Sequence, residues 1–352
     1  MSLGLYVIFY SLLIVFTIQF CFAVIYILRS NRRVARDGIK IDFISIIIPM
    51  HNEEKRIEPI LWALNNQREG LDRVEIIFVD DYSTDASVAL VNEKLKIPFQ
   101  VITNQDKKGK KHALHCGILA AQFDFVLTLD ADVYFDPYYL FNLLTVPVAD
   151  LVILPVEMKG EALFEVLNSI EFVWLQKLTF GAKQPILCNG ANLLFRKSAY
   201  FSMHQQRNDF DLVSGDDVFL LDAMLSQNKS ITRLSSANLA VETPAPESWQ
   251  SLLAQRKRWG GKTSRLKNIK VNSFVFFLLT VEISFLISLV LALFNPIFFV
   301  VIGVKFIAEF LIVYNSNLPK GNNFLAATIV HQVWYPIYLT VLLARRKKEN
   351  LW

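Results

Sequence analysis

Two carboxylates one residue apart, Asp130 and Asp132, follow the short apolar run 125–129. Such a run is typical of a buried strand, so both side chains would lie near its carboxyl end. Carboxylate oxygens suit a hard divalent cation, which keeps its other coordination positions for water and for phosphate oxygens of a substrate. A surface turn is the alternative. The position directly after a strand favours the cation site.

A second acidic pair, Asp80-Asp81, follows the apolar run 74–79 in the same way. A carboxylate there could accept hydrogen bonds from a nucleotide base or ribose. Ser83 or Asp85 could equally cap a helix, and the two interpretations are compatible. The run 107–111 holds four lysines around Gly109, which suits phosphate binding, although a solvated lysine run is the ordinary explanation.

Two further groups lie later in the chain. Asp216-Asp217 precede the apolar residues 218–221, and a carboxylate beside an apolar wall can bind protons more tightly and act as a general base. Gln255, Arg258 and Trp259 stand just before a long apolar segment. The arginine could stabilise a departing diphosphate through charge-assisted hydrogen bonds. The tryptophan could contact a sugar ring or anchor the chain at a membrane surface.

The segments between these groups alternate in character. Apolar runs at 43–49, 74–79, 99–103 and 125–129 predict strands. Helices are expected at 53–67, capped by Asn52, from about 84 to 95, and at 110–122. This order predicts an α/β fold with a mostly parallel sheet covered by helices. Ligands bind beyond the carboxyl ends of such strands, where 51–53, Asp80-Asp81 and 130–132 stand.

Composition indicates a membrane protein. Only 19% of the residues are charged, against roughly a quarter in average soluble domains, and 53% are hydrophobic. Basic clusters flank the apolar ends, as on the cytoplasmic side of a membrane, which makes nucleic acid an unexpected partner. The predicted divisions are a transmembrane anchor (1–28), a basic cytoplasmic linker (29–42), a catalytic domain (43–262), C-terminal transmembrane or interfacial helices (271–345) and a basic tail (346–352).

The number of crossings stays open. Segments 271–294, 296–315 and 323–344 could all cross, which would leave the basic residues 345–348 outside, against the positive-inside tendency. Three crossings in total, with one segment in the interface, would keep them inside. Glu282 would be costly in the middle of a crossing and would then indicate function.

The ordered series resembles the membrane-bound family 2 glycosyltransferases of GT-A fold, which include ceramide glucosyltransferases and cellulose, chitin and hyaluronan synthases. The resemblance runs from Phe43 to about Gly260. The matching motifs are 48–53, 79–85, Gly109-Lys110 with Ala113-Leu114, 130–132, 189–192, Asp216-Asp217 and Gln255-x-x-Arg258-Trp259.

This resemblance implies roles for individual residues. Asp81 would bind the nucleotide base, with Glu53, Lys110 and Asp130 beside it. Asp132, helped by Asp130, would hold Mg²⁺ or Mn²⁺ on the donor diphosphate. Asp217 would be the general base. Gln255, Arg258 and Trp259 would bind the diphosphate and line the acceptor channel.

Two departures from the family pattern affect these assignments. The family often has Glu-Asp where this chain has Asp216-Asp217, so Asp216 could be the base instead. Tyr82 and His51 replace a usual glycine and tyrosine, which bears on donor choice.

The resemblance implies an inverting transfer of sugar from a UDP- or GDP-sugar to a lipid, lipid-linked or glycan acceptor. The reaction would take place at the cytoplasmic face of a membrane, expected to be a bacterial inner membrane. A processive synthase of a β-linked polymer is the alternative. An inactive scaffold subunit of a synthase is a third hypothesis. The oligomeric state is left open.

Overall fold

The computed structural model describes residues 3–30, 41–105, 107–179, 185–204, 216–263, 269–316, 318, 320–321 and 323–346. Most of the predicted linker and tail, and the side chain of Asp216, lie outside the described residues.

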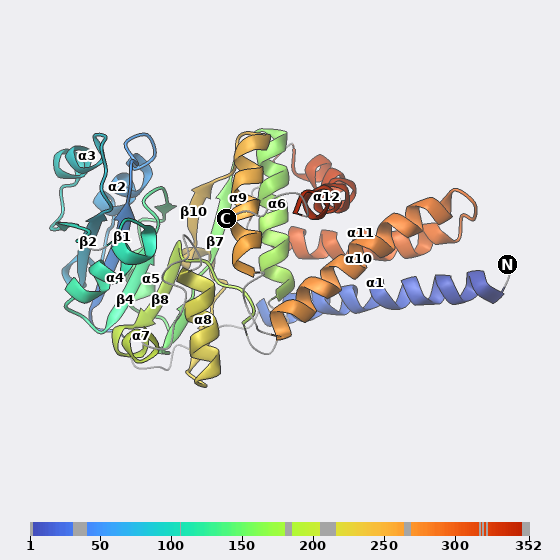
Figure 1. Ribbon diagram of the computed structural model, residues 1–352, viewed down its shortest axis with the longest axis horizontal. Coiled ribbons are helices and arrows are strands. Elements are labelled where there is room, and N and C mark those ends of the chain that lie inside the picture. Colours follow the sequence, from blue (N-terminus) through green and yellow to red (C-terminus); the bar gives the residue numbers. More distant parts are fainter. Residues whose placement is uncertain are drawn as a thin grey trace.

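Seven strands form the central sheet in the order β3-β2-β1-β4-β8-β6-β9. Strands β2, β1, β4 and β8 are labelled in Figure 1. Their bounds are β1 (Ile44–Met50), β2 (Val74–Asp80), β3 (Gln100–Thr103), β4 (Phe125–Leu129), β6 (Leu151–Ile153), β8 (Asn192–Arg196) and β9 (Ile231–Arg233). Only β8 runs antiparallel to its neighbours β4 and β6. The predicted α/β fold with a mostly parallel sheet is confirmed.

A smaller sheet has the order β5-β10-β7, with β5 (Tyr134–Phe135), β7 (Val156–Lys159) and β10 (Val241–Pro244). The helix α6 (Leu163–Leu178) packs on β7, and α9 (Trp249–Thr263) lies next to α6 (Figure 1). The other helices of this part are α2 (Glu58–Asn65), α3 (Ser87–Lys94), α4 (Lys110–Ala120), α5 (Tyr139–Leu143), α7 (Lys197–His204) and α8 (Asp216–Ser226).

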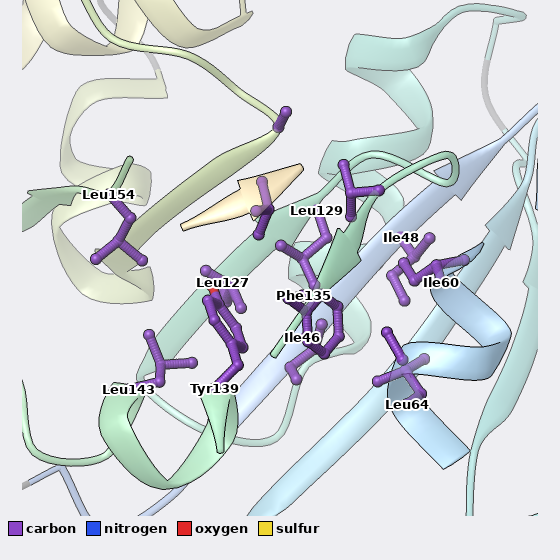
Figure 2. Close-up of a cluster of buried hydrophobic side chains, with 14 of the residues drawn as sticks. Ile46, Ile48, Ile60, Leu64, Leu127, Leu129, Phe135, Tyr139, Leu143 and Leu154 are labelled. Carbon is purple, nitrogen blue, oxygen red and sulfur yellow. The ribbon is translucent and has the colours of Figure 1, made fainter. Parts of the chain in front are cut away.

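The sheet is buried on both faces, which explains the continuous apolar runs. All seven residues of β1 are buried, and alternate side chains point to opposite faces. Ile46 and Ile48 meet Ile60 and Leu64 of α2 on one face (Figure 2). Ile47 faces α4 on the other side. There, a Cβ on Gly117 would come within 2.4 Å of Ile47 Cγ2.

The helix predicted from residue 53 begins later, at Glu58. Asn52 is not its cap, because it adopts a left-handed conformation with φ 55°. The backbone N–H of Glu53 instead donates to Ser87 Oγ at 2.7 Å, so residues 51–57 form a loop. Pro59, in the first turn of α2, suits a helix start there.

Four further helices lie at the ends of the chain: α1 (Leu3–Ser30), α10 (Ile269–Ala292), α11 (Phe298–Tyr314) and α12 (Phe324–Arg346). Helices α1, α10 and α11 run side by side away from the sheets, whereas α12 packs mainly on α6 (Figure 1). Within the described residues, two segments are long and apolar enough to cross a membrane, Leu3–Leu28 and Val271–Ala292.

Candidate active site

The carboxyl ends of β1, β2 and β4 meet at one edge of the central sheet. Met50 of β1 pairs with Asp80 of β2, and Ile47 pairs with Thr128 of β4. Residues 51–53, Asp81 and Asp130 follow these strands directly. The register therefore gathers the predicted polar groups at this edge.

Asp81 is buried and firmly held. Its N–H donates to Met50 O at 2.9 Å. Its carboxylate accepts hydrogen bonds from Asn104 Nδ2 at 2.7 Å and from the Gly109 N–H at 2.9 Å. Gly109 has φ 142°, which other residues rarely adopt. Because a carboxylate can accept about four hydrogen bonds, Asp81 shapes the loop before α4 and keeps capacity for a ligand.

Hydrogen bonds join the loop after β1 to the loop after β2, which the sequence did not predict. The N–H of Asn52 donates to Ser83 Oγ at 3.1 Å, and Asn52 Oδ1 accepts from the Thr84 N–H at 2.9 Å. Tyr82, which directly precedes Ser83, also has a positive φ of 59° and is exposed. The sequence feature that could have indicated this loop conformation is Asn52, because asparagine tolerates a left-handed backbone.

Glu53, Asp130 and Asp132 form an acidic group. Burial raises the pKa of Glu53, Arg56 at 2.8 Å lowers it, and the charges of Asp132 and Asp130 raise it further. Burial and then Asp130 raise the pKa of Asp132, against Arg56 and Lys110. Lys110 also forms an ion pair with Asp130. Residues from three loops therefore influence one another at this edge.

This group could contribute to a cation site but would not complete one. Among the described residues, no three His, Cys, Asp or Glu side chains could hold a metal ion together. Clustered carboxylates with raised pKa values nevertheless suit a cation, which would offset their repulsion. Mg²⁺ commonly uses one or two carboxylates, with substrate phosphate and water supplying the other oxygens.

Asp217 is connected to the same edge through the loop before β8. Its carboxylate accepts from the Val218 N–H at 2.8 Å and from the Gly190 N–H at 3.3 Å. The carbonyl of Gly190 accepts from Thr128 Oγ1 of β4 at 3.0 Å. The antiparallel pairing of β8 with β4 brings this loop to the carboxyl end of β4. The side chain of Asp216 lies outside the described residues.

Asn192, part of the 189–192 motif, has a structural role that its sequence position did not reveal. Its Nδ2 donates to Pro155 O at 2.8 Å and to Leu239 O at 2.9 Å, and its Oδ1 accepts from Tyr139 OH at 2.6 Å. All of this is buried, so Asn192 ties β8 to the smaller sheet and α5.

The predicted diphosphate and acceptor residues all lie on α9. Arg258 is exposed, whereas Trp259 is half-buried and its ring lies 5.6 Å from that of Phe172 on α6. Arg256, which directly follows Gln255 in the motif, is buried and forms an ion pair with Glu171. Sequence reasoning treated Arg256 only as one member of a basic cluster.

Comparisons with known proteins agree with this arrangement. Residues 45–199 match the family model "Glycosyl transferase family 2". An undecaprenyl-phosphate 4-deoxy-4-formamido-L-arabinose transferase of Pseudomonas syringae is 36% identical over 101 residues, which are 28% of this chain and 30% of that protein. A poly-beta-1,6-N-acetyl-D-glucosamine synthase of Staphylococcus aureus is 32% identical over 105 residues, which are 29% and 25% of the two chains.

The fold also resembles that of a solved mannosyltransferase from Pyrobaculum calidifontis, in complex with GDP-Man and Mn²⁺. The TM-score is 0.53 at 15% identity, over 93% of this chain and 99% of that one. The fold resembles that of GT-A glycosyltransferases, and the sequence matches are to glycosyltransferases. The part of the chain that this family model matches, residues 45–199, is therefore similar to glycosyltransferase family 2. Because its matches span less than a third of those two curated relatives, the activity of the whole protein is a proposal.

Proposed function

We propose that the chain transfers a sugar, with inversion, from a UDP- or GDP-sugar to a lipid or lipid-linked acceptor at the cytoplasmic face of a membrane. One observation carries this proposal. Asp81, the pair Asp130 and Asp132, and Asp217 come from distant parts of the sequence, and contacts along β2, β4 and β8 connect them to one edge of the sheet.

In this proposal, Asp132 with Asp130 holds Mg²⁺ or Mn²⁺. When bound, the cation neutralises charge on the donor diphosphate. Asp81 and Glu53 lie beside the nucleotide, and Lys110 balances the charge of Asp130. The mannosyltransferase of similar fold was solved with GDP-Man and Mn²⁺, which supports the class of donor and of cation.

Asp217 removes the proton from the acceptor hydroxyl, whose oxygen attacks the anomeric carbon while the bond to the diphosphate breaks. Asp216 is the alternative base. Arg258 is exposed, so it could approach the departing diphosphate. Gln255 and Trp259 would line the site of the acceptor. A single displacement inverts the anomeric carbon, which gives a β-linkage from an α-linked donor.

The end helices support a membrane location for the reaction. Helices α1, α10 and α11 run together, while α12 packs mainly against α6 of the catalytic part. We therefore propose three crossings, with α12 at the cytoplasmic interface and the basic tail inside. A bacterial inner membrane is the proposed location, and the name of the Pseudomonas relative supports a lipid-phosphate acceptor.

A processive synthase is the second candidate, because the Staphylococcus relative is a poly-beta-1,6-N-acetyl-D-glucosamine synthase. Purified protein in detergent, incubated with Mn²⁺ and a panel of UDP- and GDP-sugars plus native lipid extract, tests both. Release of nucleotide with one added sugar per lipid supports the proposal, whereas a long product supports the synthase. Absence of nucleotide binding and release across the panel would indicate the scaffold.

A further inference from the structure

The motif Gln255-x-x-Arg258-Trp259 contains a second arginine whose environment differs from that of its neighbours. Arg256 is buried, while Lys257 and Arg258 on the same helix are exposed. A buried guanidinium is costly unless it is paired and hydrogen-bonded. The burial of Arg256 inside the motif therefore needs a structural explanation.

The anchor of Arg256 comes from another helix. Its Nε donates to Glu171 Oε1 of α6 at 2.9 Å, and the two side chains are only 6% and 3% exposed. The next residue of α6, Phe172, packs on the ring of Trp259. Consecutive residues of α6 thus contact two residues of the motif helix.

The same guanidinium contacts both motif residues beside it. Its Nη1 donates to Gln255 Oε1 at 2.5 Å, and its Cζ lies 4.5 Å from the centre of the Trp259 ring. Because a guanidinium only donates hydrogen bonds, the amide oxygen of Gln255 must face it. The amide nitrogen of Gln255, a donor of two hydrogen bonds, is then directed away from Arg256.

We propose that Arg256, anchored by Glu171, is a positioning residue for the transfer reaction. It sets the amide orientation of Gln255 and the ring plane of Trp259 before substrate binds. Lysine cannot replace it, because an ammonium lacks the planar guanidinium group. That group donates hydrogen bonds to Glu171 and Gln255 and also stacks on the ring of Trp259. This inference rests on the proposed function in that Gln255 and Trp259 are taken to contact substrate.

The kinetic test is a double-mutant cycle. Arg256→Lys should lower kcat per folded molecule on the order of 10- to 100-fold, as small misplacements of contacting groups do. In a Gln255→Ala, Trp259→Ala background, the same substitution should change kcat less than about twofold. The reason is that the effects of mutations in residues that act as a unit do not add. Equal effects in both backgrounds, or a normal kcat for Arg256→Lys alone, would overturn the inference.

Arg196 provides a matched control elsewhere in the fold. It pairs with Asp124 at 3.1 Å, and its guanidinium lies 4.5 Å from the centre of the Phe125 ring. Arg196→Lys removes the same kinds of contact and should leave kcat unchanged. Glu171→Gln keeps an acceptor oxygen for Arg256 and should retain most of the activity, which a role based only on charge would not predict.

A readout without activity separates this inference from the proposed function. With 5-fluorotryptophan in place of the six tryptophans, the ¹⁹F resonance of Trp259 can be assigned by its loss in Trp259→Phe. Arg256→Met should shift this resonance and Arg196→Met should not. Should Arg256→Met not fold, Arg256→Lys gives the same comparison.

An unshifted Trp259 resonance in the folded Arg256 variant overturns the inference, whether or not the protein transfers sugar. If the wild type releases no nucleotide from any sugar donor, the proposed function fails, and the ¹⁹F comparison still tests whether Arg256 fixes the ring of Trp259.

Discussion

The ammonium of Lys305 lies 3.5 Å from Oε2 of Glu282, inside the group of apolar end helices, and both side chains are fully enclosed. Lys305 also pairs with Glu309 at 2.5 Å, and Glu309 Oε1 accepts from Gln19 Nε2 of α1 at 3.1 Å. His331 of α12 lies 3.9 Å from Glu309. A buried polar cluster therefore connects α1, α10, α11 and α12, and it accounts for the charge that Glu282 adds to an apolar segment.

Lys305→Met should destabilise the protein by about 3–5 kcal/mol, because it leaves two buried carboxylates without their cation. The triple variant Glu282→Gln, Lys305→Met, Glu309→Gln should recover part of the loss, since no charge then remains in the trio. Thermal unfolding of detergent-solubilised protein measures both. Equal melting temperatures for wild type and Lys305→Met would contradict the expectation.

Asp217→Asn should lower turnover by about 10²- to 10⁴-fold, the range that general-base catalysis contributes. Donor affinity should change little, because the donor is expected at Asp81 and Asp132. Nucleotide release and calorimetric donor binding give the two quantities. Asp222→Asn, on the same helix, is the control and should stay active. A normal rate for Asp217→Asn would shift the assignment to Asp216.

Lys110→Met should move the acidic limit of metal binding to higher pH. Burial and Asp130 raise the pKa of Asp132, while Lys110 lowers it, so removing Lys110 raises this pKa further. If Asp132 holds the cation, metal binding should be present above the pKa of Asp132 and be lost as pH falls through it. Titration of Mn²⁺ with a nucleoside diphosphate at several pH values detects the change. Lys96→Met, at an exposed position just after α3, should leave the profile in place.

Gly117→Ala should destabilise the catalytic part by about 1–3 kcal/mol, the usual cost of overpacking. The added Cβ would lie 2.4 Å from Ile47 Cγ2 and 2.8 Å from Val79 Cγ2, where α4 packs on the sheet. Gly303→Ala is the matched control in α11, since nothing lies within 4 Å of its Cβ position. Comparable melting temperatures for the two variants would show that α4 can move away.

The sequence was sufficient for the parallel half of the fold. The runs that became β1, β2 and β4 are continuous because helices cover both faces, and that continuity is visible in the residues alone. Once parallel strands are recognised, Asp81 and Asp130 must lie at one edge. The motifs 48–53, 79–85 and 130–132 are informative for the same reason, since they include the segments that follow strands whose ends meet there.

Contacts between distant segments could not be predicted in this way. The pairing of Arg256 with Glu171 joins residues on two helices, and nothing in the local pattern of α9 distinguishes Arg256 from Arg258. The hydrogen bond from Gly190 to Asp217 depends on the antiparallel β8. The hydrophobic periodicity of the sequence did not predict this strand. The start of α2 was predicted too early because Asn52 resembled a cap, while tertiary contacts hold it in a loop.

The ring of Trp174 on α6 is completely enclosed, and two of the rings against it, His331 and Tyr335, belong to α12. A ribosome finishes α6 long before it makes α12, and chains begin to fold from the N-terminus during synthesis. Trp174 therefore keeps an open apolar side until the last helix emerges. Completion of the packing around α6 should therefore depend on the docking of α12, which is made late in synthesis.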